Sequence, residues 1–114
     1  MPVRFRKKKR ISPIPLMAPS EAKRKLKNQL VIDVQNPKFA SHMIPDAKRL
    51  NLDISIKDIP KDQPILITCL NGQRSSMAAR QFMSRGYRNI CVLKGGLAAW
   101  QSAGHTLWRT KSPT

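Results

Sequence analysis

The chain alternates short apolar runs with longer segments in which apolar residues recur at helical spacing. Runs rich in Val, Ile and Leu predict three buried strands, at residues 30–34, 65–68 and 89–93. A weaker run at residues 47–52 predicts a further short strand, followed by irregular or helical chain. Strands that alternate with helices are typical of a parallel α/β sheet, in which ligands bind beyond the carboxyl ends of the strands.

Three segments around these strands predict helices. The first covers residues 20–26, with Ser20 as its N-terminal cap. The second covers residues 74–85 and is followed by Gly86, a residue that commonly ends helices. The third covers residues 97–102. The spacing within the second helix predicts an inward face made of Met77, Ala78, Gln81 and Phe82.

The length of 114 residues, 40% of them apolar, supports one small domain. Six Lys and Arg residues are concentrated in residues 1–10. Because like charges repel one another, we expect residues 1–12 to form a basic arm that is disordered in isolation. We expect the folded domain at residues 13–107 and a short tail at residues 108–114.

The composition is strongly basic, with 22 Lys and Arg residues against 6 Asp and Glu and a formal net charge of +16. This balance excludes an acidic disordered tail and favours polyanions or anionic substrates as partners. The arm at residues 1–10 is a candidate contact for RNA or an anionic surface. The charge alone does not choose between these partners.

The two cysteines, Cys69 and Cys91, form no Cys-x-x-Cys motif, and neither His42 nor His105 lies at a spacing typical of metal ligands. We therefore expect free thiols in a reducing compartment, with no metal and no cofactor. The longest apolar run is about six residues, far short of the ~18 that a bilayer span needs. We expect no transmembrane segment and a soluble, cytoplasmic protein.

One segment, between the most strand-like run and the second helix, carries the residue types of a reactive site: Cys69, Leu70, Asn71, Gly72, Gln73, Arg74 and Ser75. A cysteine at the carboxyl end of a strand meets backbone N–H groups of the turn and the positive end of the next helix. Together with the charge of Arg74, these groups favour the thiolate, which is the nucleophilic form. Gly72 gives the turn its backbone freedom. We therefore expect the nucleophile at Cys69, whereas Cys91 lies mid-strand and is expected to be inert core.

Four motifs occur in order over about 95 residues. They are residues 31–34 (Val-Ile-Asp-Val), residues 42–47 (His-Met-Ile-Pro-Asp-Ala), the loop at residues 69–75, and residues 93–100 followed by Ala103-Gly104. They resemble the motifs Asp-Val-Arg, Gly-His-Ile-Pro-Gly-Ala, Cys-x-x-Gly-x-Arg-Ser and Gly-Gly-x-x-Ala-Trp of the rhodanese family. Each motif is weak alone, and the ordered set is specific.

The resemblance implies an α/β fold with a five-stranded, mainly parallel sheet flanked by helices. It also implies a sulfurtransferase that moves a sulfane sulfur from thiosulfate or a persulfide donor to a thiophilic acceptor, which is cyanide, a small thiol or a protein cysteine. The sulfur would be carried as a persulfide on Cys69 and bound by the loop residues that follow it, Leu70 to Ser75.

Two alternatives remain beside this interpretation. The first is a non-catalytic rhodanese-like binding module tethered by the basic arm, which the intact Cys69 and Arg74 disfavour. The second is an enzyme of phosphatase or arsenate-reductase type. Those enzymes place five residues between Cys and Arg, which makes room for a tetrahedral oxyanion, whereas four separate Cys69 from Arg74 here. The tighter ring suits a single sulfur atom.

The chain departs from the family pattern at several positions. Gln35 and Lys38 stand where an arginine and an acid are common, so both sides of an ion pair are absent together. Leu70 stands where some thiosulfate-preferring members carry a basic residue. We expect His42 to be a hydrogen-bonding turn residue and Asp33 to cap a turn.

Overall fold

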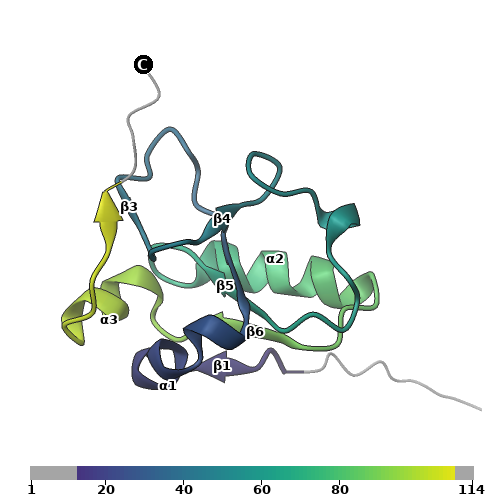
Figure 1. Ribbon diagram of the computed structural model, residues 1–114, viewed down its shortest axis with the longest axis horizontal. Coiled ribbons are helices and arrows are strands. Elements are labelled where there is room, and N and C mark those ends of the chain that lie inside the picture. Colours follow the sequence, from purple (N-terminus) through teal and green to yellow (C-terminus); the bar gives the residue numbers. More distant parts are fainter. Residues whose placement is uncertain (1–12, 110–114) are drawn as a thin grey trace, which may run out of the picture.

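The computed structural model describes residues 13–109 (Figure 1). Its main sheet has five strands in the order β1-β6-β5-β2-β4, and every neighbouring pair is parallel. This confirms the expected five-stranded parallel sheet. In spatial order, the strands are β1 (Leu16–Met17), β6 (Ile90–Leu93), β5 (Ile65–Thr68), β2 (Leu30–Asp33) and β4 (Lys48–Arg49). The predicted basic arm lies outside the described residues.

The edge strand β1 has no counterpart among the strands predicted from the sequence. The carbonyl groups of Pro15 and Met17 accept hydrogen bonds from the N–H groups of Val92 and Lys94, both at 2.9 Å. A two-residue strand shows no periodicity, and the surrounding prolines suggest a linker instead. Proline is nevertheless compatible with an edge strand, because one side of such a strand needs no N–H donor.

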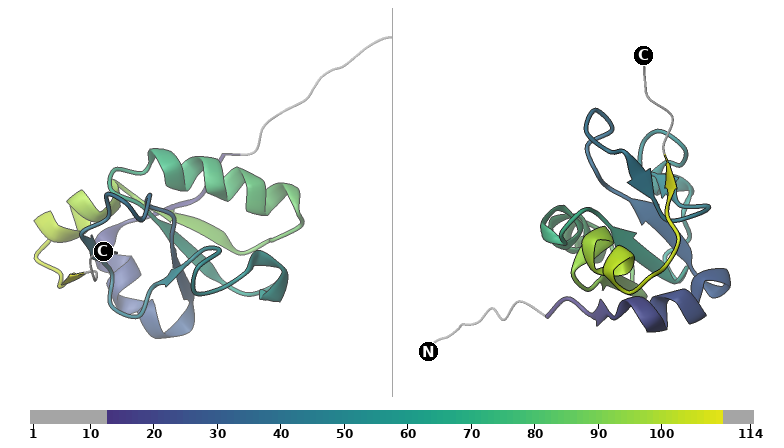
Figure 2. Two further views of the ribbon diagram at one scale, coloured as in Figure 1. Left: turned by 90° about the horizontal axis from the view of Figure 1, so that it is seen from above. Right: turned by 90° about the vertical axis from the view of Figure 1, so that its left-hand side faces the viewer.

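Helices cover both faces of the sheet (Figure 2). α2 (Gln73–Ser84) packs on one face with the short 3-10 turn η2 (Ile56–Asp58). α1 (Pro19–Arg24) and α3 (Gly96–Ser102) pack on the other, with a second 3-10 turn, η1 (Leu26–Asn28), after α1. Side chains of β5 alternate between the two cores: Leu66 joins the α1–α3 core, and Ile65 and Ile67 join the α2 core. The apolar run of β5 is therefore buried on both sides, as is usual in parallel sheets.

Two details of the predicted helices are wrong. Ser20 does not cap α1, because the helix begins one residue earlier, at Pro19, and has no side-chain cap. The inward face predicted for α2 is wrong in part: Phe82 is buried and Ala78 packs against the same core, as predicted, but the other two residues do not. Met77 is 68% exposed and Gln81 is exposed. The helix starts at Gln73, and the residues that it buries are Ser75, Ala79 and Phe82.

A second, two-stranded sheet pairs β3 (His42–Met43) with β7 (Trp108–Arg109) in antiparallel fashion. It joins the segment after β2 to the last described residues, which lie side by side in Figure 1. This pairing was not predicted from the sequence. Both strands are only two residues long, and more than sixty residues separate them along the chain.

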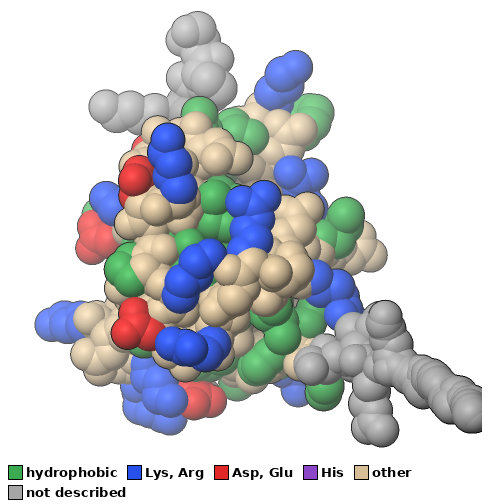
Figure 3. All heavy atoms as spheres, turned by 90° about the vertical axis from the view of Figure 1, so that its right-hand side faces the viewer, with side chains coloured by type: hydrophobic (Ala, Val, Ile, Leu, Met, Phe, Trp, Pro, Cys, Tyr) green, Lys and Arg blue, Asp and Glu red, His purple; other side chains and the backbone are tan. Residues whose placement is uncertain are grey.

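The folded surface keeps the cationic character of the sequence. Blue Lys and Arg side chains outnumber red Asp and Glu on the face drawn in Figure 3. Residues 13–109 contain one ion pair, which joins Lys25 Nζ to Glu21 Oε2 at 2.9 Å between two exposed side chains. No helix in that range combines the length and apolar character needed to cross a membrane.

Candidate functional site

Cys69 follows the last residue of β5 at the carboxyl edge of the sheet, between β2 and β6. Its side chain is 1% exposed. The backbone N–H of Gly72 donates a hydrogen bond to Sγ at 3.0 Å, and the N–H of Ser75, in the first turn of α2, donates another at 3.4 Å. Both N–H groups therefore point their partial positive charge toward the sulfur.

The loop conformation that aims these N–H groups depends on Gly72. This residue has φ of +99°, in the left-handed region that favours glycine, and it is the N-cap of α2. Its carbonyl accepts hydrogen bonds from the N–H and the hydroxyl of Ser76, at 3.1 and 2.9 Å. Asn71 Oδ1 accepts from the N–H of Gln73 at 3.1 Å. The turn is therefore held by the residues that it connects.

α3 supports the loop from behind. Its first N–H groups donate to the loop carbonyls, from Leu97 to Cys69 at 2.8 Å and from Ala98 to Leu70 at 3.1 Å. This approach requires Gly96, because a Cβ there would lie 2.6 Å from the Cys69 oxygen and 2.5 Å from the Leu70 oxygen. Gly96, the second glycine of the Gly-Gly motif, therefore allows α3 to hold the loop at residues 69–75 in place.

Arg74 lies beside the loop with its side chain exposed. Its Nε donates a hydrogen bond to the carbonyl of Val34, just past β2, at 2.8 Å. Within the described part of the chain, the hydrogen-bond donors to Cys69 Sγ are the two loop amides, and the guanidinium is not among them. Arg74 thus places a positive charge at the mouth of the site, rather than in contact with the sulfur.

An open pocket of about 370 Å³ leads to Cys69. One wall comes from the loop and the start of α2, and the other from the segment after β2. The lining residues are Gln35, Asn36, Phe39, Ala40, Cys69, Leu70, Asn71, Gln73 and Arg74. Five of the seven residues singled out in the sequence line this pocket, whereas Gly72 and Ser75 lie behind it and supply amides.

The second wall of the pocket was not predicted from the sequence. Gln35, Asn36 and Phe39 follow the carboxyl end of β2, which is the neighbour of β5 in the sheet. Because carboxyl ends of adjacent parallel strands meet at one edge, the Asn-Pro turn after residue 34 was a usable signal for this wall.

Gln35 replaces the family's arginine and still makes polar contacts. Its backbone N–H and its Nε2 donate to the two carboxylate oxygens of Asp33, at 3.0 and 3.1 Å. Nε2 also donates to the carbonyl of His42 at 2.9 Å. Asp33 therefore caps a turn, as expected. Its side chain is 2% exposed, and this burial raises its pKa despite the bonds from Gln35.

The other candidate residues of the sequence lie away from this pocket. His42 is half-buried in strand β3, so its expected place in a turn is wrong, whereas its Nδ1 lies 3.0 Å from Ser41 Oγ in the expected hydrogen bond. Cys91 is half-buried in β6 beside the α1–α3 core. Burial, with a smaller contribution from the Glu21 charge, raises the pKa of the Cys91 thiol. No group of three potential metal ligands is gathered anywhere in residues 13–109.

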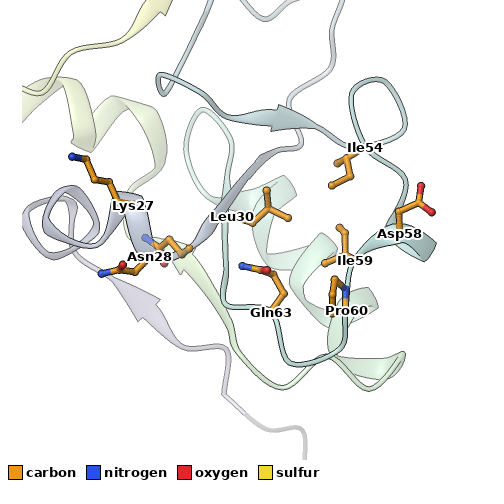
Figure 4. Close-up of a pocket in the computed structure, with 9 residues that line it drawn as sticks. Lys27, Asn28, Leu30, Ile54, Asp58, Ile59, Pro60 and Gln63 are labelled. Atoms are coloured by element: carbon orange, nitrogen blue, oxygen red, sulfur yellow. The ribbon is translucent and has the colours of Figure 1, made fainter.

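A larger pocket, of about 500 Å³, lies at the opposite, amino end of the sheet (Figure 4). Its lining includes Lys27, Leu30, Ile59, Pro60 and Gln63. It contains no cysteine, histidine, serine or threonine. Of the described residues that line these two pockets, the cysteine that receives two amide hydrogen bonds lies in the smaller one.

Comparisons with known proteins agree with this architecture. The model of the rhodanese-like domain family matches residues 18–103. A sulfurtransferase of Allochromatium vinosum is 38% identical over 66% of this chain and 74% of its own length. The thiosulfate sulfurtransferase GlpE of Pseudomonas syringae pv. syringae is 30% identical over 74% of this chain and 85% of its own.

Solved structures show the same fold. The solution structure of a rhodanese-like domain from Anabaena sp. has a TM-score of 0.74 at 21% identity and covers 88% of this chain and 85% of that one. A rhodanese-related protein from Thermoplasma volcanium has a TM-score of 0.68 at 24% identity, with coverage of 82% and 97%. With its matching motifs, sheet order and cysteine loop, the chain belongs to the rhodanese-like domain family.

Proposed function

We propose that this protein is a sulfurtransferase that carries a sulfane sulfur as a persulfide on Cys69. The observation that supports this most strongly is the pair of amide N–H groups, from Gly72 and Ser75, that point at a cysteine sulfur at the base of an open pocket. Such donors stabilise a thiolate before reaction and a negatively charged sulfur after it.

In the first half-reaction, the Cys69 thiolate attacks the outer sulfur of a donor such as thiosulfate. A bond forms between Sγ and that sulfur, and the bond from the sulfur to the sulfite group breaks. The bonding electrons leave with sulfite, so no external oxidant or reductant is needed. In the second half-reaction, an acceptor thiolate or cyanide takes the outer sulfur, and the electron pair of the broken S–S bond returns to Sγ.

The loop is suited to a sulfur atom more than to a phosphate group. Four residues separate Cys69 from Arg74, and the sulfur already receives its N–H donors from within this short turn. Arg74, at the mouth, adds positive potential for an anionic donor. Thiosulfate is one candidate donor, because several relatives are named thiosulfate sulfurtransferases. Leu70 supplies no charge to the pocket, which leaves a persulfide donor as the other candidate.

Mass spectrometry of the protein after incubation with thiosulfate tests the proposal. Wild-type protein should gain the mass of one sulfur atom on the peptide that contains Cys69, and cyanide should remove it with release of thiocyanate. Cys69→Ser should gain nothing, because serine does not form a persulfide. Cys91→Ser is the matched control and should load normally. Sulfur on the Cys91 peptide, or turnover by Cys69→Ser, would refute the assignment.

A further inference from the structure

Two large apolar side chains stand exposed at the mouth of the Cys69 pocket. Phe39 is 81% exposed and Leu70 is 62% exposed, and both line the pocket, from opposite walls. Single exposed apolar residues are common on protein surfaces. A pair of them on opposite walls of the pocket that leads to Cys69 is a different arrangement, because a molecule large enough to fill this pocket contacts both.

The turn that carries Phe39 is fixed by hydrogen bonds. The N–H groups of Phe39 and Ala40 both donate to the Asn36 carbonyl at 3.0 Å, and the N–H of Lys38 donates to Asn36 Oδ1 at 3.0 Å. Just before the turn, Gln35 is bound to Asp33 and to the His42 carbonyl. Phe39 is therefore presented to solvent by an ordered backbone, which lowers the entropy lost on binding.

The charges at the mouth are positive. Arg74 lines the pocket, and exposed Lys38 precedes Phe39 in the same turn. None of the residues that line this pocket is acidic, and the nearby carboxylate of Asp33 is buried and bound to Gln35. The mouth is thus complementary to a ligand that is apolar beside its reactive atom and negative farther out.

From this arrangement we infer that the sulfur acceptor is a cysteine on a flexible segment of another protein, flanked by apolar residues and a nearby carboxylate. This inference rests on the proposed function and names the acceptor class. Cyanide or a small free thiol reaches the sulfur but leaves Phe39 and Leu70 in water. A peptide segment covers both side chains while its cysteine enters between them, and the buried apolar area favours its binding.

The transfer step balances without a further reactant. The acceptor thiolate attacks the outer sulfur of the Cys69 persulfide, and a new S–S bond forms on the acceptor. The bond between the outer sulfur and Cys69 Sγ breaks, and its electron pair stays on Sγ as a thiolate. The Gly72 and Ser75 amides, already aimed at Sγ, stabilise this leaving group.

Three synthetic pentapeptides with a central cysteine test the inference. The first has leucine on both sides of the cysteine and aspartate at both ends. The second replaces the leucines with glycine, and the third replaces the aspartates with asparagine. Protein loaded with sulfur from thiosulfate is mixed with each peptide, and the second-order rate of sulfur transfer is followed by mass spectrometry. Leucine should raise the rate over glycine by about tenfold, as expected when one apolar side chain becomes partly buried. Aspartate should raise it over asparagine, and salt should reduce that second gain.

Two variants test whether the preference for the leucine peptide arises at Phe39. Phe39→Ala should lower the leucine-to-glycine rate ratio severalfold, and the part that remains is the contribution of Leu70. Leu52→Ala removes another exposed apolar residue, 61% exposed and in the chain between β4 and η2, and should keep the full ratio. Equal rates for the leucine and glycine peptides in wild-type protein would overturn the inference. A leucine preference as large in Phe39→Ala as in wild type would overturn it as well.

A binding measurement separates this inference from the proposed function. Fluorescent versions of the peptides with serine in place of cysteine cannot accept sulfur, and their affinity for wild-type protein is read from anisotropy. Tighter binding of the leucine peptide, weakened in Phe39→Ala, supports the peptide-docking surface even if no sulfur is transferred, and in that case the proposed sulfur transfer fails while the docking surface stands. Normal sulfur loading with no peptide preference in either measurement refutes the acceptor class alone.

Discussion

Gly96 lies so close to Cys69 that the carbonyl oxygen of the cysteine occupies the space a side chain at Gly96 would need. A Cβ there would approach that oxygen to 2.6 Å, and the residue has φ of +67°. Through this contact the start of α3 determines where the reactive loop runs. The two elements are joined further by the hydrogen bond from the Leu97 N–H to the Cys69 carbonyl at 2.8 Å.

We therefore expect Gly96→Ala to lower both stability and activity, because the added methyl must push the loop away. Gly104→Ala is the matched control, since Gly104 also has positive φ, +85°, but has open space around it. Both variants share the conformational penalty of roughly 1–2 kcal/mol for a left-handed L-residue. Gly96→Ala should unfold at a lower temperature than Gly104→Ala and should lose sulfur-transfer activity. Equal unfolding temperatures and equal activities in the two variants would contradict the role given to this contact.

Arg74 is expected to assist the anionic steps from the mouth of the pocket. Arg74→Ala should slow transfer from thiosulfate by ~10–1000-fold if the loss resembles that of an oxyanion-stabilising donor. Arg74→Lys should recover only part of the rate. Lysine restores the positive charge but lacks the guanidinium, whose Nε donates to the Val34 carbonyl. Steady-state kinetics with thiosulfate and cyanide give these rates.

Arg80→Ala is the control for the loss of charge, because Arg80 is also exposed on α2. Its rate should stay close to that of wild type. A parallel measurement of Cys69 alkylation at fixed pH reports on thiolate formation. Alkylation as fast in Arg74→Ala as in wild type would mean that the Gly72 and Ser75 amides activate the sulfur alone.

Asp33 should make stability fall as pH rises. Burial raises the pKa of this carboxyl in the folded state above its ordinary value of 3.8, so the folded protein holds the proton more tightly than the unfolded chain. The stabilising contribution is complete below pH 3.8 and is lost as pH rises from there through the raised value. Urea unfolding at a series of pH values above 3.8 measures this effect. As pH rises, the free energy of unfolding of wild type should fall relative to that of Asp33→Asn, because asparagine does not titrate. Parallel curves for the two proteins would show that Asp33 does not titrate with a raised pKa.

The basic arm should act on polyanion binding and leave small-molecule chemistry unchanged. Deleting residues 2–10 removes six cations of the predicted arm, whereas the Cys69 pocket is lined by described residues of the domain, from Gln35 to Arg74. Turnover of thiosulfate and cyanide should therefore stay the same. If each cation contacts one phosphate of single-stranded RNA, the slope of log affinity against log salt should flatten by up to ~4. Identical slopes for the full-length and shortened proteins would leave the arm without a role in RNA binding.

The sequence was sufficient for the parts of the fold with strong local signals. The runs at β2, β5 and β6 and the loop at residues 69–75 were recognisable because buried parallel strands and a Cys-to-Arg spacing are local patterns. The α2 face was harder. Ser75 is buried although it is polar, and its backbone N–H donates to Cys69 Sγ, whereas Met77 is exposed although it is apolar. Helical periodicity alone does not contain that information.

Other features depend on contacts between distant parts of the chain. β1 exists because Pro15 and Met17 meet β6, more than seventy residues later. The position of Phe39 beside Cys69 depends on the adjacency of β2 and β5. A sequence pattern identifies Phe39 only as an apolar residue in a turn, whereas the sheet order makes it part of the pocket wall.

The direction of β1 has a practical consequence. This strand runs parallel to β6, so the chain enters the sheet from the amino end, whereas Cys69 lies at the carboxyl end. A fluorophore, bead or fusion partner attached ahead of residue 13 is therefore joined to the domain at the edge opposite the sulfur. Immobilisation through that terminus should leave the pocket facing outward, so sulfur delivery by large donors can be studied on a surface.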